Sequence, residues 1–198
     1  MLKKIIFPLI VVSSTSSFAN DVQNQTEVGL LLGLASGGDT MASFEFDDGS
    51  SDNIKAGSGF LLGASLKAPI TEVNEQQIDL IASFNYMSDS VSASNGDASF
   101  SRLPIELLVS TRFDSLSISG GFTYHLSPEF EVDLAGDSGS VEADDALGYV
   151  LEANYHLSNG SRSNNLYFGL KYTNIEYDFT GASFDGSGFA ITMGTYFN

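Results

Sequence analysis

Apolar residues recur at every second position in eight separate segments of this 198-residue chain. Neighbouring side chains of a strand point to opposite faces, so such alternation predicts strands that each separate two unlike environments. One face carries leucine, isoleucine, phenylalanine and tyrosine and no charge, whereas the other is mainly glycine, serine, threonine and asparagine with a few charges. The eight segments cover residues 28–35, 60–67, 77–86, 102–113, 116–125, 147–157, 166–173 and 188–197.

The composition favours strands and turns over helices. The chain has 20 glycines, 15 phenylalanines and 8 tyrosines against 4 prolines, and 42% of its residues are hydrophobic, which is enough for a folded chain. It has no cysteine, which excludes disulfides and thiolate metal sites. Its formal net charge of −17 makes nucleic acid an unsuitable partner, because phosphate binding needs clustered cations.

The first residues have the order of a secretory signal peptide. Lys3 and Lys4 precede the apolar stretch 5–12, and a small-residue segment ends in Ser17-Phe18-Ala19. We therefore expect a signal peptide over 1–19 and an exported domain over 20–198. No later stretch is apolar for long enough to cross a membrane as a helix, so a membrane-embedded domain would cross as strands.

The connections between the segments also alternate in kind. Segments 69–75, 114–115 and 158–164 make short turns, whereas 37–57 and 127–145 are long and acidic, an asymmetry typical of membrane barrels. We predict an all-β fold, an eight-stranded antiparallel up-and-down transmembrane β-barrel. We expect the long segments to be mobile loops on the extracellular rim, with Phe44 and Phe46 as a possible continuation of a strand. A soluble barrel with eight strands is the alternative, but its apolar face would have to point inward.

The C-terminal run resembles a known class of membrane protein. Residues 188–197 look like the closing strand of small bacterial outer-membrane proteins, and 148–157 with 166–172 resemble their penultimate hairpin. The class includes the OmpA N-terminal domain and OmpX-like proteins. The resemblance implies the outer membrane of a Gram-negative bacterium, surrounding lipid and lipopolysaccharide, and the barrel-assembly machinery as a partner in biogenesis. Asn198 departs from the pattern, since such chains usually end on an aromatic residue.

The sequence predicts a monomeric integral outer-membrane protein with a structural or surface-interaction role and an unknown extracellular ligand. We expect no enzyme activity, no open porin and no cofactor. The alternatives are a soluble periplasmic ligand-binding barrel and a lipid A-modifying, deacylase-like enzyme. The latter reading rests on His125-Leu126-Ser127 with Glu129 or Glu131, but the same tripeptide recurs at 156–158, on the opposite rim.

The acidic loops raise the possibility of metal binding. Residues 47–52 and 137–145 supply carboxylates, yet neither follows the spacing of a calcium-binding loop, so we predict solvated acid and no metal site. Adhesion through strand edges at 172–178 and 185–188 is a further hypothesis. Polyanionic glycans are unsuitable ligands, because the loops have the same sign of charge.

Eight strands enclose a lumen that is only wide enough to be filled by side chains. If Leu157 lies opposite Leu166 across the turn, then Glu152 lies opposite Lys171 and both point inward. Lys67 and Asp79 face each other similarly across the preceding hairpin, within one residue. The charges on the polar face that we predict to fill the lumen are Lys67, Asp79, Glu106, Arg112, Glu152 and Lys171.

Overall fold

The computed structural model describes residues 25–45, 51–93, 96–134, 137–157 and 165–197, so the signal peptide predicted for 1–19 lies outside it. The described residues form strands and no helix, and none of them forms a helix that could cross a membrane. The strands are β1 (Glu27–Gly37), β2 (Thr40–Glu45), β3 (Ser51–Lys55), β4 (Gly59–Val73), β5 (Gln76–Ala93), β6 (Gly96–Phe113), β7 (Leu116–Leu134), β8 (Asp137–Glu142), β9 (Ala146–Leu157), β10 (Asn165–Asn174), β11 (Glu176–Phe179), β12 (Ala182–Asp185) and β13 (Gly188–Phe197).

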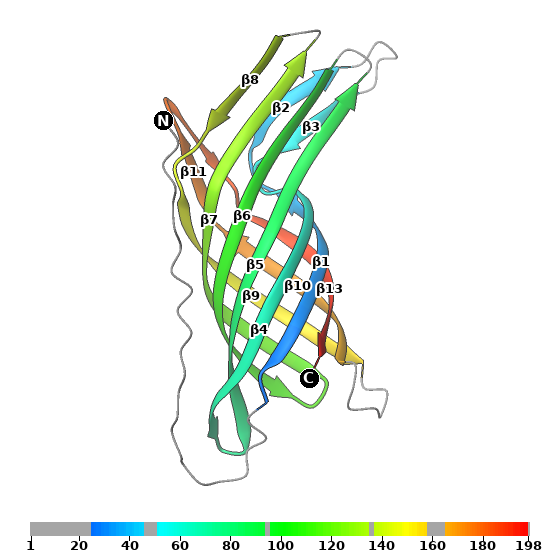
Figure 1. The fold of residues 1–198 in the computed structure, drawn as a ribbon, viewed down its shortest axis with the longest axis vertical. Helices are drawn as coiled ribbons and strands as arrows, with labels where there is room; N and C mark the ends of the chain where they lie inside the picture. The colour runs from blue at the N-terminus through cyan, green and yellow to red at the C-terminus, as the bar shows by residue number, and fades with distance from the viewer. Residues whose placement is uncertain (1–24, 46–50, 94–95, 135–136, 158–164, 198) are drawn as a thin grey trace.

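Eight long strands close into a barrel, which confirms the predicted eight-stranded antiparallel fold (Figure 1). Around the ring the order is β1, β4, β5, β6, β7, β9, β10 and β13, and every neighbouring pair is antiparallel. Pairing of β1 with β13 closes the ring, with Val28 opposite Phe197 and Gly37 opposite Gly188. Closure leaves the barrel no open edge.

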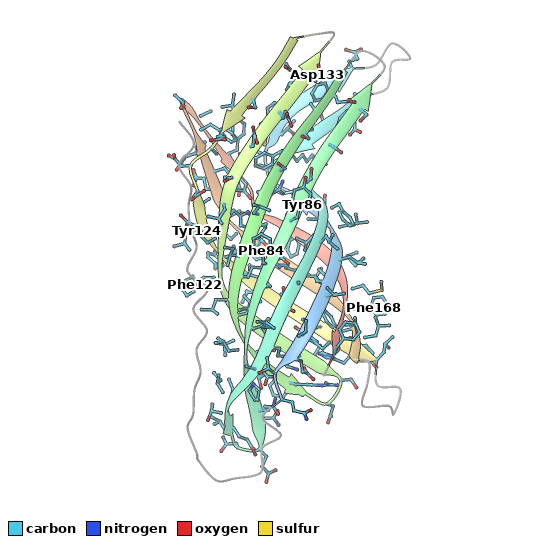
Figure 2. The ribbon with its side chains drawn as sticks, viewed as in Figure 1. Phe84, Tyr86, Phe122, Tyr124, Asp133 and Phe168 are labelled. Atoms are coloured by element: carbon cyan, nitrogen blue, oxygen red, sulfur yellow. The ribbon has the colours of Figure 1, made fainter. Side chains whose placement is uncertain are left out.

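The alternation places the apolar face on the outside of the barrel. The exposed outward side chains include Leu34, Phe122, Leu147 and Ile191, and the outward positions of all eight strands between the barrel ends are uncharged. Figure 2 shows Phe84, Tyr86, Phe122, Tyr124 and Phe168 on this outer surface. The barrel therefore has a continuous apolar belt in place of the charged exterior of a soluble carrier.

The segment predicted as a connection over 69–75 is mostly strand. β4 continues to Val73 and β5 begins at Gln76, so only Asn74 and Glu75 form the turn, both with positive φ (51° and 64°). Two consecutive residues with positive φ suit the twist of a hairpin. The extension carries a register shift between Pro69 and Thr71, because proline offers no N–H to the ladder.

The prediction of long loops at the opposite end was also wrong for most of the described residues. Within 37–57 the hairpin β2–β3 forms, and within 127–145 β7 continues to Leu134 and pairs with β8. Phe44 lies in β2, whereas Phe46 falls outside the described residues. We call this end of the molecule the cap. It consists of the hairpins β2–β3 and β11–β12, of β8, and of the ends of β5, β6 and β7 at residues 88–93, 96–101 and 128–134. We call the opposite end, which holds the β4–β5 and β6–β7 turns, the turn end.

In the cap strands the apolar side chains point inward and the polar side chains point outward, which is the reverse of the arrangement in the barrel. Apolar side chains here point inward and pack around Phe100 and Tyr177, whose rings meet edge to face at 5.3 Å, together with Ile54, Val91, Ala98 and Ile175. Backbone hydrogen bonds join the connections, from Asp39 to Asp185 (2.7 Å) and from Asp144 to Asp178 (2.9 Å). This buried cluster gives the cap a core of its own, as a water-exposed sheet requires.

Candidate functional site

Side chains fill the barrel interior because glycines at the paired positions of neighbouring strands make room for them. A Cβ on Gly63 would collide with the Asn85 amide, and one on Gly194 would collide with the Tyr167 hydroxyl. The Tyr167 and Tyr196 rings stack at 5.5 Å near the turn end. Two cavities that lie along the described lumen measure about 30 and 10 Å³, so the interior there resembles a packed core with room for a few waters.

A buried ion cluster spans the middle of the lumen. Lys171 and Glu152 are register partners on β10 and β9, and their charged atoms lie 3.2 Å apart. Lys171 also reaches across the interior to Glu106 of β6, with Nζ 2.5 Å from Oε1. The second oxygen of Glu106 accepts a hydrogen bond from the Ser83 hydroxyl at 2.9 Å. One ammonium therefore joins two carboxylates that lie on different strands.

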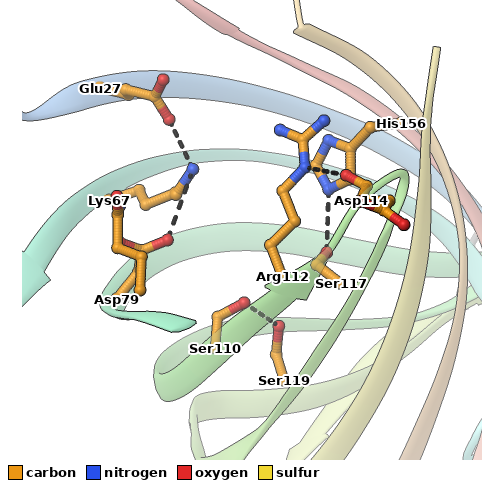
Figure 3. Close-up of polar contacts among 10 residues, drawn as sticks. Glu27, Lys67, Asp79, Ser110, Arg112, Asp114, Ser117, Ser119 and His156 are labelled. Atoms are coloured by element: carbon orange, nitrogen blue, oxygen red, sulfur yellow. Dashed lines mark hydrogen bonds and ion pairs between the residues drawn. The ribbon is translucent and has the colours of Figure 1, made fainter. Parts of the chain in front are cut away.

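A second cluster of the same form lies near the turn end (Figure 3). Lys67 Nζ is 2.7 Å from Glu27 and 3.6 Å from Asp79. In the register, Lys67 faces Ile81, whereas Asp79 faces Pro69, so the two predicted partners meet diagonally and not directly. Glu27, on the inward face of β1, faces Lys67 directly. Glu27 is two residues before Gly29 and therefore lies on the same face of the strand. This spacing was the sequence signal that could have added Glu27 to the predicted lumen charges.

Arg112 takes a different place from the other five predicted charges. It lies beside the β6–β7 turn, where Nε donates to the backbone carbonyl of Asp114 at 2.8 Å (Figure 3). Close by, the hydroxyl of Ser117 and Nε2 of His156 are 2.9 Å apart. No ion pair in the described part of the chain joins Arg112 to the two lysine clusters.

Arg102 is a lumen charge that the sequence reasoning left out. It lies on the inward face of β6 at the border between lumen and cap, with 1% of its surface exposed. Arg102 stands on the same face of the strand as Pro104, Glu106 and Leu108, and this period-two spacing could have predicted that it points into the lumen. The neighbouring strand contributes His125, which hydrogen-bonds through Nδ1 to the Tyr177 hydroxyl at 2.6 Å.

The groups of the deacylase hypothesis do not converge. His125 is buried and engaged by Tyr177, while the Ser127 N–H donates to Asp145 Oδ1 at 2.9 Å. Glu129 and Glu131 lie on the outward face of β7, because the strand changes its facing at Ser127. As for metals, no three acidic or imidazole side chains gather into a possible ion site within the described ranges.

The outer face of the cap sheet is uniformly polar and acidic. On β5, β6, β7 and β8 every outward position of the cap is serine, aspartate or glutamate. Two pairs of like charge stand directly opposite each other, Asp97 with Asp133 and Glu129 with Glu142. The full set is Ser88, Ser90, Ser92, Asp97, Ser99, Ser101, Glu129, Glu131, Asp133, Ser138, Ser140 and Glu142. Asp133 is labelled on this sheet in Figure 2.

The fold is shared with solved outer-membrane proteins. The sequence matches no protein-family profile, and no curated protein is similar to it in sequence. Among solved structures, Ail, the attachment invasion locus protein of Yersinia pestis, superposes with a TM-score of 0.53 at 16% identity, over 88% of this chain and 99% of Ail.

Two further structures give the same result. Ail in complex with the heparin analogue sucrose octasulfate has a TM-score of 0.52 at 17% identity, over 87% of this chain and 98% of Ail. Neisserial surface protein A has a TM-score of 0.52 at 13% identity, over 87% and 96% of the two chains. At these identities the likeness concerns the fold. The chain has the fold of the small eight-stranded outer-membrane β-barrels.

Proposed function

We propose that this protein is an integral outer-membrane β-barrel of the bacterial surface, with neither catalytic nor porin activity, whose acidic cap is an interaction surface outside the membrane. The observation that carries the proposal is the uncharged apolar belt around a barrel with a packed polar interior. Water cannot stabilise such an exterior, whereas lipid can. The predicted signal peptide over 1–19 supports export, and the shared fold supports the outer membrane.

The packed lumen supports a closed barrel. The Lys171 and Lys67 clusters, with the serines and asparagines between them, leave only small cavities along the described interior. An eight-stranded barrel is filled by its side chains, whereas porins with 16 or 18 strands enclose a channel. The purified protein in a planar bilayer is expected to show no stable porin-sized conductance. Steady channels of that size would overturn this part of the proposal.

The cap supports a role at the surface. It projects from the barrel as a sheet with its own core (Figure 2), and the described outward positions of its β5, β6, β7 and β8 segments carry only serine, aspartate and glutamate. Ail has been solved with a heparin analogue, which is a polyanion. The cap of this chain has the opposite preference, because unneutralised carboxylates such as Asp97 and Asp133 repel anions and attract cations. Its ligand is accordingly a cationic one.

Fractionation tests the location, and gel migration tests the barrel. We expect the protein in the outer-membrane fraction, with faster migration of the unheated sample on a denaturing gel. A protein found in the soluble periplasm would end the membrane proposal.

Surface labelling of cysteine variants on intact cells tests the orientation. A membrane-impermeant thiol reagent must label Ser90→Cys on the cap and must not label Asn74→Cys in the β4–β5 turn.

A comparison of lipid A tests the absence of deacylase activity. We expect lipid A from cells with and without the protein to show the same acylation by mass spectrometry. The dispersal of His125, Ser127 and Glu129 supports this expectation. Loss of an acyl chain only in cells that hold the protein would establish the enzyme alternative.

A further inference from the structure

The border between lumen and cap contains a buried cation without a carboxylate partner. Arg102 donates from Nη2 to the Ser58 carbonyl at 2.8 Å and from Nη1 to the Phe100 carbonyl at 3.4 Å. Its guanidinium carbon lies 4.6 Å from the centre of the Phe100 ring. Nε is buried and has no hydrogen-bond partner in the described part of the protein. Carbonyl and ring contacts ease the burial of this charge but do not neutralise it.

The groups around Arg102 do not supply the missing negative charge. The carboxylate of Asp89 acts on it electrostatically, but Oδ2 of Asp89 accepts the Lys55 N–H at 3.0 Å, and no described carboxylate forms an ion pair with Arg102. Tyr177 hydrogen-bonds to Arg102, but burial raises the pKa of its phenol, so Tyr177 stays neutral at physiological pH and brings no negative charge. Arginine does not lose its proton in proteins. The positive charge therefore persists.

A cavity of about 30 Å³ lies beside this guanidinium. Its lining includes Arg102, His125, Lys171, Glu106 and Tyr177. Two carboxylates engage Lys171, so Arg102 is the group left to attract a ligand. The volume suits one or two species of the size of water.

We propose that this cavity binds one small monovalent anion of halide size, held by Nε of Arg102 at the cap end of the lumen. The bound anion would neutralise the guanidinium and fill the cavity at once, which favours the folded state. The competing arrangement has water in the cavity, with the surplus negative charge of the Lys171 cluster balancing Arg102 across it. The two arrangements differ in whether an anion occupies the site.

Bromide provides a direct test. Crystals of the refolded full-length barrel, grown or soaked in sodium bromide, should show an anomalous scattering peak in the cavity beside Arg102 Nε. Parallel crystals in sodium gluconate, whose anion is too large, should show none. A peak supports the proposal. An ordered water without an anomalous signal at high bromide would overturn it.

Thermal unfolding in detergent provides a second test in solution. At constant ionic strength, replacing gluconate with chloride should raise the unfolding midpoint saturably, by about 3–6 °C at ten times the dissociation constant. Arg102→Met should abolish this shift, whereas the matched control Arg112→Met, at the turn end, should retain it. An equal midpoint in all salts, or a shift retained in Arg102→Met, would overturn the proposal. If Arg102→Met does not fold, the bromide crystals of the native chain decide alone.

Discussion

Removal of Lys171 should destabilise the barrel more than a substitution on the water-exposed cap, because two carboxylates depend on it. Lys171 lies 2.5 Å from Glu106 and 3.2 Å from Glu152, and the side chains of Lys171 and Glu106 are each 4% exposed. Lys171→Met keeps the length of the stem but leaves two buried carboxylates without a cation. Breaking a buried pair from one side costs about 3–5 kcal/mol, since an uncompensated charge remains. We expect a loss of that size in the free energy of unfolding.

The assay is equilibrium unfolding in urea of protein refolded into lipid vesicles, followed by circular dichroism, because the chain has no tryptophan. Lys55→Met on β3 is the matched control and should change stability by less than about 0.5 kcal/mol. The triple variant Lys171→Met, Glu106→Gln, Glu152→Gln should regain most of the loss, since the orphaned charges are gone. A Lys171→Met protein as stable as the parent would refute the reasoning, and so would a triple variant no better than the single one.

Two further predictions concern the wall of the barrel. Gly121→Ala should destabilise the protein by about 1–3 kcal/mol in the same assay, because the added Cβ would collide with the Leu107 carbonyl. Gly139→Ala in β8 is the control and should be neutral, because its Cβ would meet nothing within 4 Å. Equal stability of the two variants would contradict the close approach of β6 and β7. Leu151→Arg, at an exposed position midway along β9, should lower the free energy of unfolding in vesicles by about 2–4 kcal/mol. Ser90→Arg on the cap is the control and should change stability by less than about 0.5 kcal/mol. A Leu151→Arg protein as stable as the parent would contradict the inference that lipid surrounds the apolar belt.

The period-two pattern was enough to predict the barrel and part of its register. Glu152 and Lys171 could be paired from the sequence because both flank one turn and the ladder is regular on either side of it. The same reasoning missed by two positions for Lys67 and Asp79, because the turn lies at Asn74 and Glu75, later than a direct pairing of these two residues requires, so Lys67 faces Ile81. Contacts across the lumen, such as Lys171 with Glu106, depend on the circumference and could not be read from neighbouring strands.

The cap was missed because its strands follow the opposite rule. Residues 88–101 lie between two of the eight predicted segments, and Phe130 lies in a segment predicted as an acidic loop, so none of them was assigned to a strand. Their packing partners Tyr177 and Ile54 come from distant hairpins, so the core appears only when the chain is folded. The unpaired charge of Arg102 was likewise invisible, because its lack of a partner depends on that folding.

A single residue marks the boundary between the two halves of β7. Below Ser127 the inward residues are Thr123 and His125, and above it they are Pro128 and Phe130, so the facing changes from odd to even numbers. Ser127 has a positive φ of 46°, and the pairing with β6 slips between Ser101 and Leu103. This is how a β-bulge with one extra residue acts.

The bulge makes the count of residues at this point matter more than their identity. Deletion of the one extra residue would leave a regular strand in which Phe130 still faced the apolar cluster. Insertion of one more residue, in contrast, would turn the cap half of β7 over, so that Phe130 faced water and Glu131 faced the apolar cluster. Substitution of Ser127 by asparagine or glycine, which tolerate positive φ, would leave both faces in place. Over evolutionary time this position should therefore accept substitutions and the loss of the single extra residue, but not the gain of another one, which would shift every later side chain to the wrong face much as an inserted base shifts a reading frame.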